Sequence, residues 1–332
     1  MDFILYSVEN TLFICKILSC KYRKKSLLLT HFPLKLWRIL YFFVGLQFVN
    51  TLDMIVAKTL DEFIQARAAL EHQDSIGFVP TMGALHQGHI SLVEESVKRC
   101  KHTIVSIFVN PTQFNNPQDL ATYPRTLEAD CALLEASGVD IAFAPRVIDI
   151  YPTPDERVFD LGGLDTYGEG PRRPGHFNGV AQVVTRLFDI VKPHFSFFGE
   201  KDFQQVAIIK YFVKTLNYPL EIVQCPTLRE EDGLAKSSRN TLLTPAQREA
   251  APHIYKCLQK AVEYSQSMSP AQVIEAVTKE IDSNPELETE YIELVDADML
   301  KPVTSWDDAQ KVQLWCAVYA RPVRLIDNIK IR

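Results

Sequence analysis

Short apolar runs alternate with amphipathic helical patterns from Ile76 onward, and this alternation constrains the fold more than any other feature of the chain. Such alternation is typical of βαβ units, whose strands lie parallel in one sheet. We therefore predict an α/β fold with a Rossmann-like, doubly wound parallel sheet. The expected strands are Ile76–Val79, Thr103–Val109, Val139–Ala144, Phe195–Phe198 and Leu220–Val223. The helices expected between them are His89–Cys100, Thr126–Ser137, Val180–Val191 and Phe203–Leu216.

The pattern changes after Pro226, which predicts a second, smaller α+β C-terminal domain. Two segments, Thr244–Gln247 and Ser269–Gln272, each place a hydroxyl at the N-cap of a helix, Pro at its first position and Gln at its third. Strand-like runs follow at Glu290–Val295, Val312–Tyr319 and Val323–Ile331. We expect the first domain to span residues 54–227 and the second to span 228–332.

The first 53 residues differ from the rest of the chain. Their apolar runs, Thr11–Cys20 and Ile39–Val49, are shorter than the roughly 18 to 20 apolar residues of a membrane-spanning helix. Asp2 and Glu9 are untypical of a signal-peptide start. We expect residues 1–53 to be an atypical, poorly ordered extension, with a membrane anchor as the less favoured alternative. A short strand at Met54 and a helix over Leu60–Leu70 then begin the folded part.

Composition narrows the partners of this 332-residue chain. A formal net charge of −6, with only one short basic stretch at Lys21–Lys25, argues against a nucleic-acid backbone as partner. The seven cysteines form no Cys-x-x-Cys pair, so neither a zinc site nor a disulfide framework is indicated. Dispersed thiols suit a reducing, cytoplasmic location.

Two glycines and two histidines join an expected strand to an expected helix at Pro80–His89. A helix N-terminus offers free backbone N–H groups and the positive end of the helix dipole, and Gly83 and Gly88 would let an anion approach the backbone. His86 and His89 are three residues apart, so they share a helix face. Their spacing differs from that of a metalloprotease pair, and phosphate stabilisation is favoured over metal binding or simple capping.

Other polar segments follow expected strands, where doubly wound sheets bind their ligands. They are Asn110–Phe114, which contains Gln113, and Gly199-Glu200-Lys201-Asp202. Lys201 is a candidate phosphate cation, Asp202 a candidate partner of ribose or magnesium, and Gln204 or Gln205 a candidate contact to a small polar substrate. Arg172, Arg173 and His176 are candidates for recruiting a carboxylate, with capping or ion pairing as the alternative.

The segment Leu228–Asn240 concentrates charge, Gly and Ser in one loop. Composition alone predicts a mobile surface loop. Ser237, Ser238 and Arg239 also suit a lid that closes over a triphosphate and excludes water.

Taken together, six motifs resemble those of the pantothenate synthetase (pantoate–beta-alanine ligase) family, within the nucleotidyltransferases that carry a His-x-Gly-His motif. The resemblance runs from about Met54 to the C-terminus. The motifs are Pro80–His89, Ile107–Phe114, Tyr123–Thr126, Arg173–Val180, Phe198–Gln205 and Asp232–Asn240.

The resemblance implies an ATP-dependent ligase in which pantoate forms pantoyl adenylate and pyrophosphate, after which β-alanine displaces AMP. It also implies Mg²⁺, a homodimer, a lid role for the C-terminal domain and His89 as a proton donor. Gln113 and Gln205 would hold pantoate. The implied catalytic residues are His86, His89, Lys201, Ser237, Ser238 and Arg239. The implied ATP-binding residues are Met82, Gly83, Ala84, Leu85, His86, Gln87, Gly88, His89, Gly199, Glu200, Lys201, Asp202, Leu228, Lys236, Ser237, Ser238 and Arg239.

This chemistry fits the residues without a covalent enzyme intermediate. A carboxylate with a pKa near 4 is already ionised at neutral pH, so the first step needs charge neutralisation and alignment more than a general base. The sequence departs from the family pattern at Lys236, where an apolar residue is usual, and in residues 1–53. An adenylyltransferase acting on a phosphate ester and a nucleotide-binding regulator are the alternatives. Gln113 and Gln205 argue against the first, and intact Lys201 with Ser237-Ser238-Arg239 argues against the second.

Overall fold

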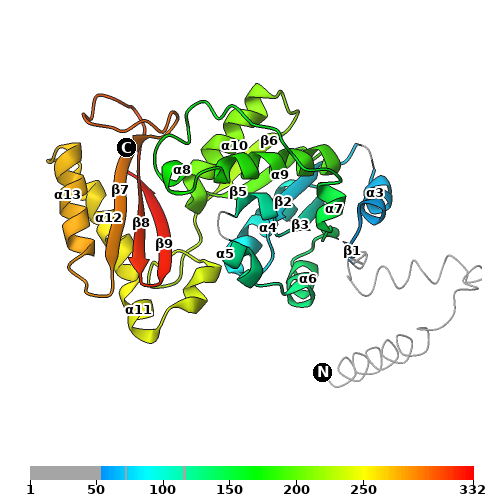
Figure 1. Ribbon diagram of the computed structural model, residues 1–332, viewed down its shortest axis with the longest axis horizontal. Helices are drawn as coiled ribbons and strands as arrows, with labels where there is room; N and C mark the ends of the chain where they lie inside the picture. Colours follow the sequence, from blue (N-terminus) through cyan, green and yellow to red (C-terminus); the bar gives the residue numbers. More distant parts are fainter. Residues whose placement is uncertain (1–53, 72, 115–116) are drawn as a thin grey trace, which may run out of the picture. The chain divides into compact units, whose positions relative to one another are not determined.

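The computed structural model describes residues 54–71, 73–114 and 117–332, which form a six-stranded parallel sheet and a three-stranded antiparallel sheet, each with its own helices (Figure 1). The prediction for residues 1–53 lies outside this described part. Within it, no helix combines the length and apolarity that crossing a bilayer requires.

The six-stranded sheet has the doubly wound arrangement that the sequence predicts. Its order is β1-β4-β3-β2-β5-β6, and all its pairs are parallel. The chain steps from β2 to β3 and β4 on one side and reaches β5 and β6 on the other. The strands are β1 Ile55–Ala57, β2 Ile76–Thr81, β3 His102–Ile107, β4 Ile141–Phe143, β5 Phe195–Gly199 and β6 Glu221–Cys225.

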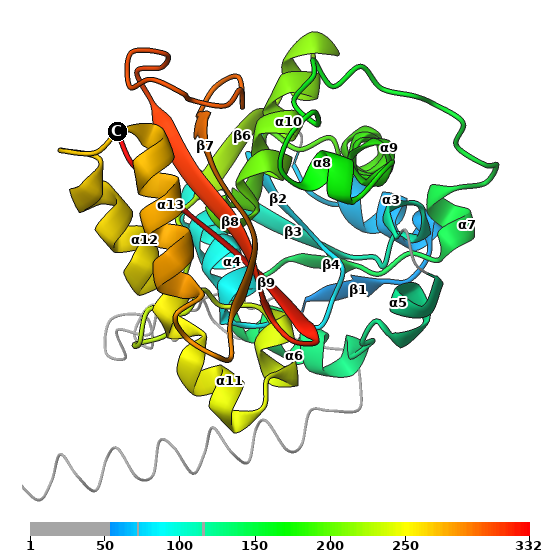
Figure 2. The same cartoon turned by 60° about the vertical axis from the view of Figure 1, so that its left-hand side comes forward.

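Both faces of this sheet are buried because helices cover each of them. Alternate side chains of a strand point to opposite faces, so each strand contributes to two cores. Phe78 and Ile104 belong to a core with helices α3, α9 and α10, whereas Val79 and Val105 belong to a core with α4 and α6. Figure 2 shows helices in front of and behind the strands. The long helices are α3 Leu60–Ala68, α4 Gln87–Arg99, α6 Leu127–Ala136, α9 His176–Val191 and α10 Phe203–Thr215. Shorter ones are α5 Pro117–Thr122, α7 Val147–Ile150 and α8 Glu169–Arg172.

Among the boundaries that differ from the sequence prediction, two involve a residue that usually interrupts secondary structure. Helix α9 begins at His176 although Gly179 lies in its first turn. A Cβ on Gly179 would lie 2.4 Å from the carbonyl oxygen of Thr112, so the glycine permits close contact with the loop after β3. Strand β2 continues through Pro80 because its pairing with β5 ends at Phe78, which leaves Pro80 outside that ladder.

The three-stranded sheet carries helices on one face, as the α+β prediction requires. Its strands, in the order β7-β8-β9, are β7 Glu288–Asp296, β8 Val312–Ala320 and β9 Val323–Lys330. The helices are α11 Pro245–Ala250, α12 Pro252–Tyr264 and α13 Pro270–Ile281. Thr244 and Ser269 form the capping boxes that the sequence indicates. The sequence prediction missed the break between α11 and α12, where Pro252 begins a new helix.

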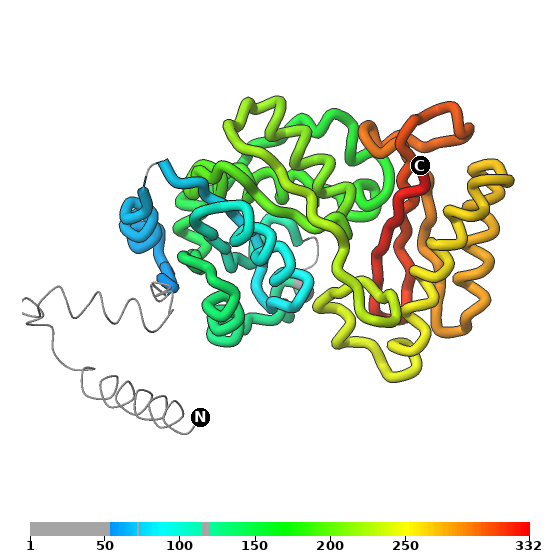
Figure 3. The backbone as a smooth tube through the Cα atoms, turned by 180° about the vertical axis from the view of Figure 1, so that it is seen from behind, coloured from blue at the N-terminus to red at the C-terminus, as the bar shows by residue number. Residues whose placement is uncertain are grey.

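The two sheets are joined by one segment that runs from β6 to α11. Figure 3 follows it from the green part of the chain into the yellow helices. It contains a β-bridge between Arg229 and Ala235 and a 3₁₀ helix, η3, over Ser238–Leu242. Leu234 and Ala235 are buried, and Leu234 belongs to the core of the C-terminal sheet. This segment is therefore anchored and differs from a wholly mobile loop.

Candidate active site

The carboxyl ends of β2 and β5 mark the point where the winding of the sheet reverses, since β3 lies on the far side of β2 and β6 on the far side of β5. Ligands of doubly wound sheets bind at such a point. The Met82–His89 turn follows β2, and the 3₁₀ helix η2 (Glu200–Asp202) follows β5. The structure therefore brings together the two segments that the sequence predicts for phosphate binding.

His86 and His89 stack against one another at the start of α4. His86 is the N-cap residue, and its Nδ1 accepts a hydrogen bond from the Gly88 N–H at 3.1 Å. His89 Nδ1 accepts from the His86 N–H at 3.3 Å, and the two ring centroids are 4.0 Å apart. Because each Nδ1 is an acceptor, the ring proton of each neutral histidine lies on Nε2. This places a hydrogen-bond donor where a metal-binding histidine would present a lone pair.

Both imidazoles are neutral at neutral pH. Burial lowers the pKa of His89 to about 3, and the neighbouring His86 ring adds to the effect. Burial also lowers the pKa of His86, assisted by Lys201 and Lys236 and opposed by Asp202 and Glu230. Because both rings are neutral, the pair can stabilise an anion by donating hydrogen bonds from its Nε2–H groups, and neither ring has to release a proton.

Asp130 of α6 holds the turn that carries this pair. The Asp130 side chain is buried, and its two oxygens accept hydrogen bonds from the Ala84 N–H at 3.0 Å and the Leu85 N–H at 2.8 Å. Gly83 and Ala84 have φ values of 82° and 50°, in the left-handed region that costs free energy for a residue with a Cβ. Asp130 offsets that cost. Asp130 does not stand out in the sequence, because an acidic residue in the first turn of a helix is ordinary.

The structure changes which groups of the Met82–His89 turn are available to bind an anion. The N–H groups of Ala84, Leu85 and Gly88 donate hydrogen bonds to protein acceptors. They are therefore not the free backbone donors that the sequence predicts for anion binding. A Cβ on Gly88 would lie 2.8 Å from Cε1 of His86. Gly88 therefore makes room for the imidazole ring, and the two Nε2–H groups are the candidate anion donors of the turn.

Gln113 lies beside this turn, as its position after β3 predicts. Its Nε2 donates to Met82 Sδ at 3.0 Å, and its Oε1 accepts from Asn110 Nδ2 at 3.2 Å. The Gln113 carbonyl oxygen accepts a hydrogen bond from His176 Nδ1 at 3.0 Å. Burial, with Arg173 nearby, lowers the pKa of His176 to about 4. His176 is thus a neutral ring whose Nε2 keeps its lone pair.

The structure separates the two glutamines at the start of α10. Gln204 is buried, and its amide bonds the Glu169 N–H and the carbonyl oxygens of Leu164 and Tyr167. Both glutamines line a cavity with Arg173, His176 and Lys201, but Gln205 is only half-buried. Gln205 is therefore the more accessible of the two, whereas the amide of Gln204 is already hydrogen-bonded within the protein.

A residue of the C-terminal sheet holds the segment that carries Lys201. Asn328 of β9 donates both hydrogens of its side-chain amide, to the carbonyl oxygens of Glu200 and Lys201, each at 3.0 Å. Its Oδ1 accepts from Gln313 Nε2 at 2.7 Å. Lys201 Nζ lies 4.0 Å from Asp202 Oδ1, and Glu200 Oε1 accepts from Gln224 of β6. In the sequence, Asn328 is a polar residue within the strand-like run Val323–Ile331, and this was the signal that could have identified it.

The connecting segment supplies the other predicted residues. The Leu228 carbonyl oxygen accepts a hydrogen bond from the Lys236 N–H at 2.9 Å, which closes a hairpin. Lys236 Nζ donates to Glu230 Oε2 at 2.7 Å. Ser237 caps η3 by accepting the Arg239 N–H, and the Ser238 carbonyl oxygen accepts from the Thr241 hydroxyl. Arg239 is exposed.

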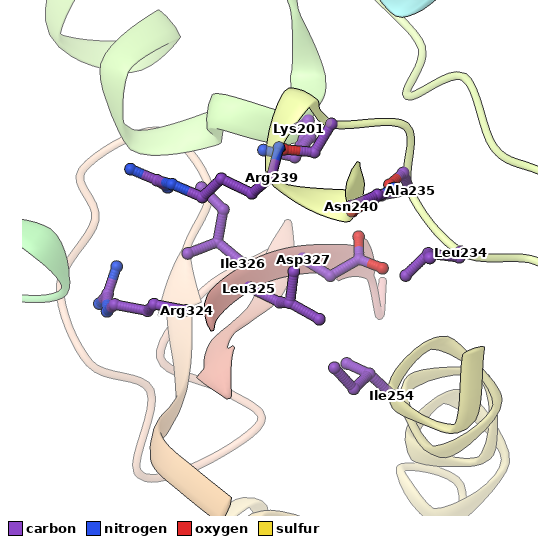
Figure 4. A pocket seen from close by; sticks show the side chains of 11 residues that line it. Lys201, Leu234, Ala235, Arg239, Asn240, Ile254, Arg324, Leu325, Ile326 and Asp327 are labelled. Atoms are coloured by element: carbon purple, nitrogen blue, oxygen red, sulfur yellow. The ribbon is translucent and has the colours of Figure 1, made fainter. Parts of the chain in front are cut away.

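Lys201, Ser237 and Arg239 line one pocket with Arg324 of β9 (Figure 4). Figure 4 shows Lys201 and Arg239 together on one side, with the Arg239 and Arg324 guanidinium groups turned the same way. Arg324 forms two hydrogen bonds with the buried Glu169, at 2.7 and 3.0 Å. Although burial opposes its charge, Glu169 and Glu290 raise the pKa of Arg324. Arg324 is therefore committed to carboxylates, whereas Arg239 faces solvent.

The described residues offer no preformed metal cage. Among residues 54–71, 73–114 and 117–332, no three His, Cys, Asp or Glu side chains gather in a group that could hold a metal ion. Mg²⁺ usually keeps several waters and binds through one or two carboxylates plus substrate phosphates. Asp202, beside Lys201, is the carboxylate that fits such a partial site.

Comparison with known proteins agrees with this geometry. The family model described as pantoate-beta-alanine ligase matches residues 55–330. Pantothenate synthetase of Bacteroides thetaiotaomicron is 50% identical over 280 residues, which cover 84% of this chain and 99% of the relative. The Bacteroides fragilis protein of the same name is 49% identical over 280 residues, with the same two coverages.

Solved structures give the same result. Pantothenate synthetase from Thermus thermophilus superimposes with a TM-score of 0.78 at 42% identity, covering 84% of this chain and 99% of that one. Pantoate-beta-alanine ligase from Francisella tularensis, complexed with beta-gamma ATP and beta-alanine, superimposes with a TM-score of 0.71 at 40% identity, covering 84% and 98%.

Proposed function

The chain belongs to the pantoate–beta-alanine ligase family, and from this premise we propose how its residues carry out the ligation. The enzyme condenses pantoate with β-alanine in an ATP-dependent reaction. In the first step a pantoate carboxylate oxygen attacks the α-phosphorus of ATP, and the bond to pyrophosphate breaks. In the second step the β-alanine nitrogen attacks the acyl carbon, the bond to AMP breaks and the amine loses a proton.

The observation that carries the proposal is the neutral imidazole pair at the switch point of the sheet, opposite Lys201. Negative charge grows on the phosphate oxygens during the first step, and preorganised donors stabilise it. We assign this role to the Nε2–H groups of His86 and His89 and to the Lys201 ammonium. The lowered pKa of His89 favours hydrogen-bond donation over the proton-donor role that the family resemblance implies.

Pantoate would lie between Gln113 and Gln205. Gln113 adjoins Met82 at the turn, and Gln205 lines the cavity that contains Lys201. Two neutral amides suit the hydroxyl groups and the carboxylate of a hydroxy acid, whereas a phosphorylated acceptor would require more cations. The nucleotide would occupy Met82–His89 and Gly199–Asp202, with Leu228 and Lys236 to Arg239 completing its site. Gln87 is exposed at the start of α4, within that surface.

Magnesium would enter as the complex with ATP. We propose Asp202 as its protein ligand, with the remaining positions taken by phosphate oxygens and water. The ion would supply further charge neutralisation at the phosphates. The protein residues themselves position the reactants, which is the larger part of catalysis when two substrates must be aligned.

We also propose the wider setting of the enzyme. The boundary between an ATP- and pantoate-binding domain, residues 54–227, and a C-terminal lid domain, residues 228–332, follows the division between the two sheets. By family resemblance the enzyme is a homodimer. The five described cysteines are free thiols, which suits a cytoplasmic location.

Exchange of radiolabelled pyrophosphate into ATP tests the reaction directly. We expect exchange that requires both pantoate and Mg²⁺ and does not require β-alanine. Exchange that ignores pantoate but occurs with a phosphorylated acceptor would refute the ligase and favour an adenylyltransferase. Light scattering on the eluted protein tests the dimer separately.

A further inference from the structure

Two lysine–carboxylate pairs adjoin the imidazole pair. Lys201 lies 4.0 Å from Asp202, and Lys236 lies 2.7 Å from Glu230. All four charges act on His86, because the two lysines assist burial in lowering its pKa and the two carboxylates oppose this. The second pair comes from the connecting hairpin, far along the chain from the histidines.

The backbone contacts fix Lys236 close to the His86–His89 turn. The hairpin hydrogen bonds are Lys236 N–H to Leu228 O at 2.9 Å and Glu230 N–H to Leu234 O at 2.8 Å. A Cβ built on Gly88 would lie 3.6 Å from Cβ of Lys236. The root of the lysine side chain therefore faces the turn, while its ammonium is directed to Glu230.

The Lys236–Glu230 pair is partly solvated, with 22% of the lysine side chain and 36% of the glutamate side chain exposed. Ion pairs of this kind contribute little to stability, because water competes for both charges. A bound triphosphate offers several anionic oxygens to the same ammonium, and charge-assisted hydrogen bonds to phosphate are strong. Glu230 and the nucleotide phosphates thus compete for the Lys236 ammonium, and the phosphates form the stronger hydrogen bond.

We propose that Lys236 exchanges its partner when the nucleotide binds, leaving Glu230 and donating to a phosphate oxygen of ATP. Glu230 then acts as an internal competitor that occupies the cation in the empty enzyme. This inference rests on the proposed ATP site, and it adds a residue that sets nucleotide affinity. Glu230 lowers that affinity only through Lys236.

The experiment measures ATP binding by isothermal titration calorimetry in the full chain with Mg²⁺ at fixed ionic strength. The variants are Lys236→Met, Glu230→Gln and the double substitution. Glu231→Gln and Lys279→Met are matched controls, since both residues are exposed and the second lies on α13. Circular dichroism confirms that each variant is folded, and Lys236→Gln replaces Lys236→Met if the apolar side chain impairs folding.

We expect Lys236→Met to weaken ATP binding about tenfold, the lower end of the effect of one charge-assisted hydrogen bond. Glu230→Gln should tighten binding about threefold, because the ammonium no longer has an ionised partner to leave. In the Lys236→Met background, Glu230→Gln should have no effect. The two controls should bind ATP like the unmodified enzyme.

Two results would overturn the exchange. One is an unchanged ATP affinity in Lys236→Met. The other is equal tightening by Glu230→Gln in both backgrounds, which would show that Glu230 repels the nucleotide directly. Pantoate-dependent pyrophosphate exchange by the unmodified enzyme is measured in parallel. If that exchange fails while ATP binding depends on Lys236, the ligase proposal is wrong and the partner exchange stands.

Discussion

The two sides of the candidate site are held in different ways. On one side, the turn between β2 and α4 is fixed by residues from elsewhere in the fold, with Asp130 of α6 taking two of its N–H groups. On the other side, Lys236 and Ser237 find their partners within their own segment, and Arg239 is exposed. The first side is preorganised by tertiary contacts. On the second side the backbone is anchored through Leu234 and Arg229, but the side chains that would reach the nucleotide have only local partners.

This difference assigns different tasks to the two sides. Groups that stabilise a transition state must already be in place, because reorganisation during the reaction costs free energy. Groups that capture a substrate can adjust as it binds. Substitutions in the turn should therefore lower kcat, and substitutions in the connecting segment should mainly raise KM for ATP.

The largest effect is expected from removing one preorganised donor. His89→Ala or Lys201→Ala should lower the rate of adenylation by about 10² or more, the scale for losing one oxyanion-type stabiliser. ATP affinity should fall much less. Pyrophosphate exchange at saturating ATP measures the rate, and Lys98→Ala on the exposed side of α4 is the matched control. A near-normal rate would show that these groups are not stabilisers.

Asp130 tests whether the turn must be held from outside. Asp130→Asn keeps the shape of the side chain but replaces one acceptor oxygen by a donor that faces a backbone N–H. We expect kcat to fall about 30-fold, equivalent to the free energy of leaving one buried group unpaired. KM for ATP should change little. A change confined to KM would place Asp130 in substrate binding instead.

The pH dependence of stability tests the neutral state of His89, whose ring is half-buried. Its pKa is about 3 in the folded protein and about 6.5 when unfolded, so protons bind preferentially to the unfolded chain below pH 6.5. Stability from this residue is complete above pH 6.5 and is lost as the pH falls toward 3. At pH 5 the loss should be about 2 kcal/mol relative to pH 7.

His89→Gln cannot titrate and should lack this part of the loss. Urea unfolding at pH 7 and pH 5 gives the free energies, and NMR of the His89 ring reports its titration directly. A ring that titrates near pH 6.5 in the folded enzyme would contradict the neutral pair and would revive the proton-donor role.

On the adjustable side, Arg239→Gln should raise KM for ATP about tenfold, because one charge-assisted contact to phosphate is lost. kcat should fall by less than KM rises. Steady-state kinetics with varied ATP separates the two constants, and Lys256→Gln on the exposed side of α12 is the control. An equal fall in kcat and kcat/KM would show that Arg239 acts only in the transition state.

The smallest effect is expected from deleting residues 1–53. The family match covers residues 55–330, and every residue assigned to the site lies within it. Activity and solubility should be unchanged, as measured by pyrophosphate exchange and by the yield of soluble protein. Loss of folding would show that these residues belong to the core.

The sequence by itself determined the doubly wound sheet, the capping boxes and the segments that form the site. Those features depend on local pattern: periodicity of two or 3.6, cap residues, and position after a strand. Gln113, Lys201 and the two histidines were predicted as site residues for the same reason. The end of β2 and the start of α9 were harder, because Pro80 and Gly179 usually interrupt elements and are tolerated here by neighbours distant in sequence.

Only the tertiary structure decided which groups are available to a ligand. It showed that the N–H groups of Ala84, Leu85 and Gly88 are already hydrogen-bonded. It also showed that the Gln204 amide is hydrogen-bonded within the protein while Gln205 is more accessible, and that Lys236 is paired with Glu230. It also revealed Asp130 and Asn328 as supports. The physical reason is that a hydrogen bond can join residues of any separation in sequence, so the partners of a polar group are fixed only when the chain is folded.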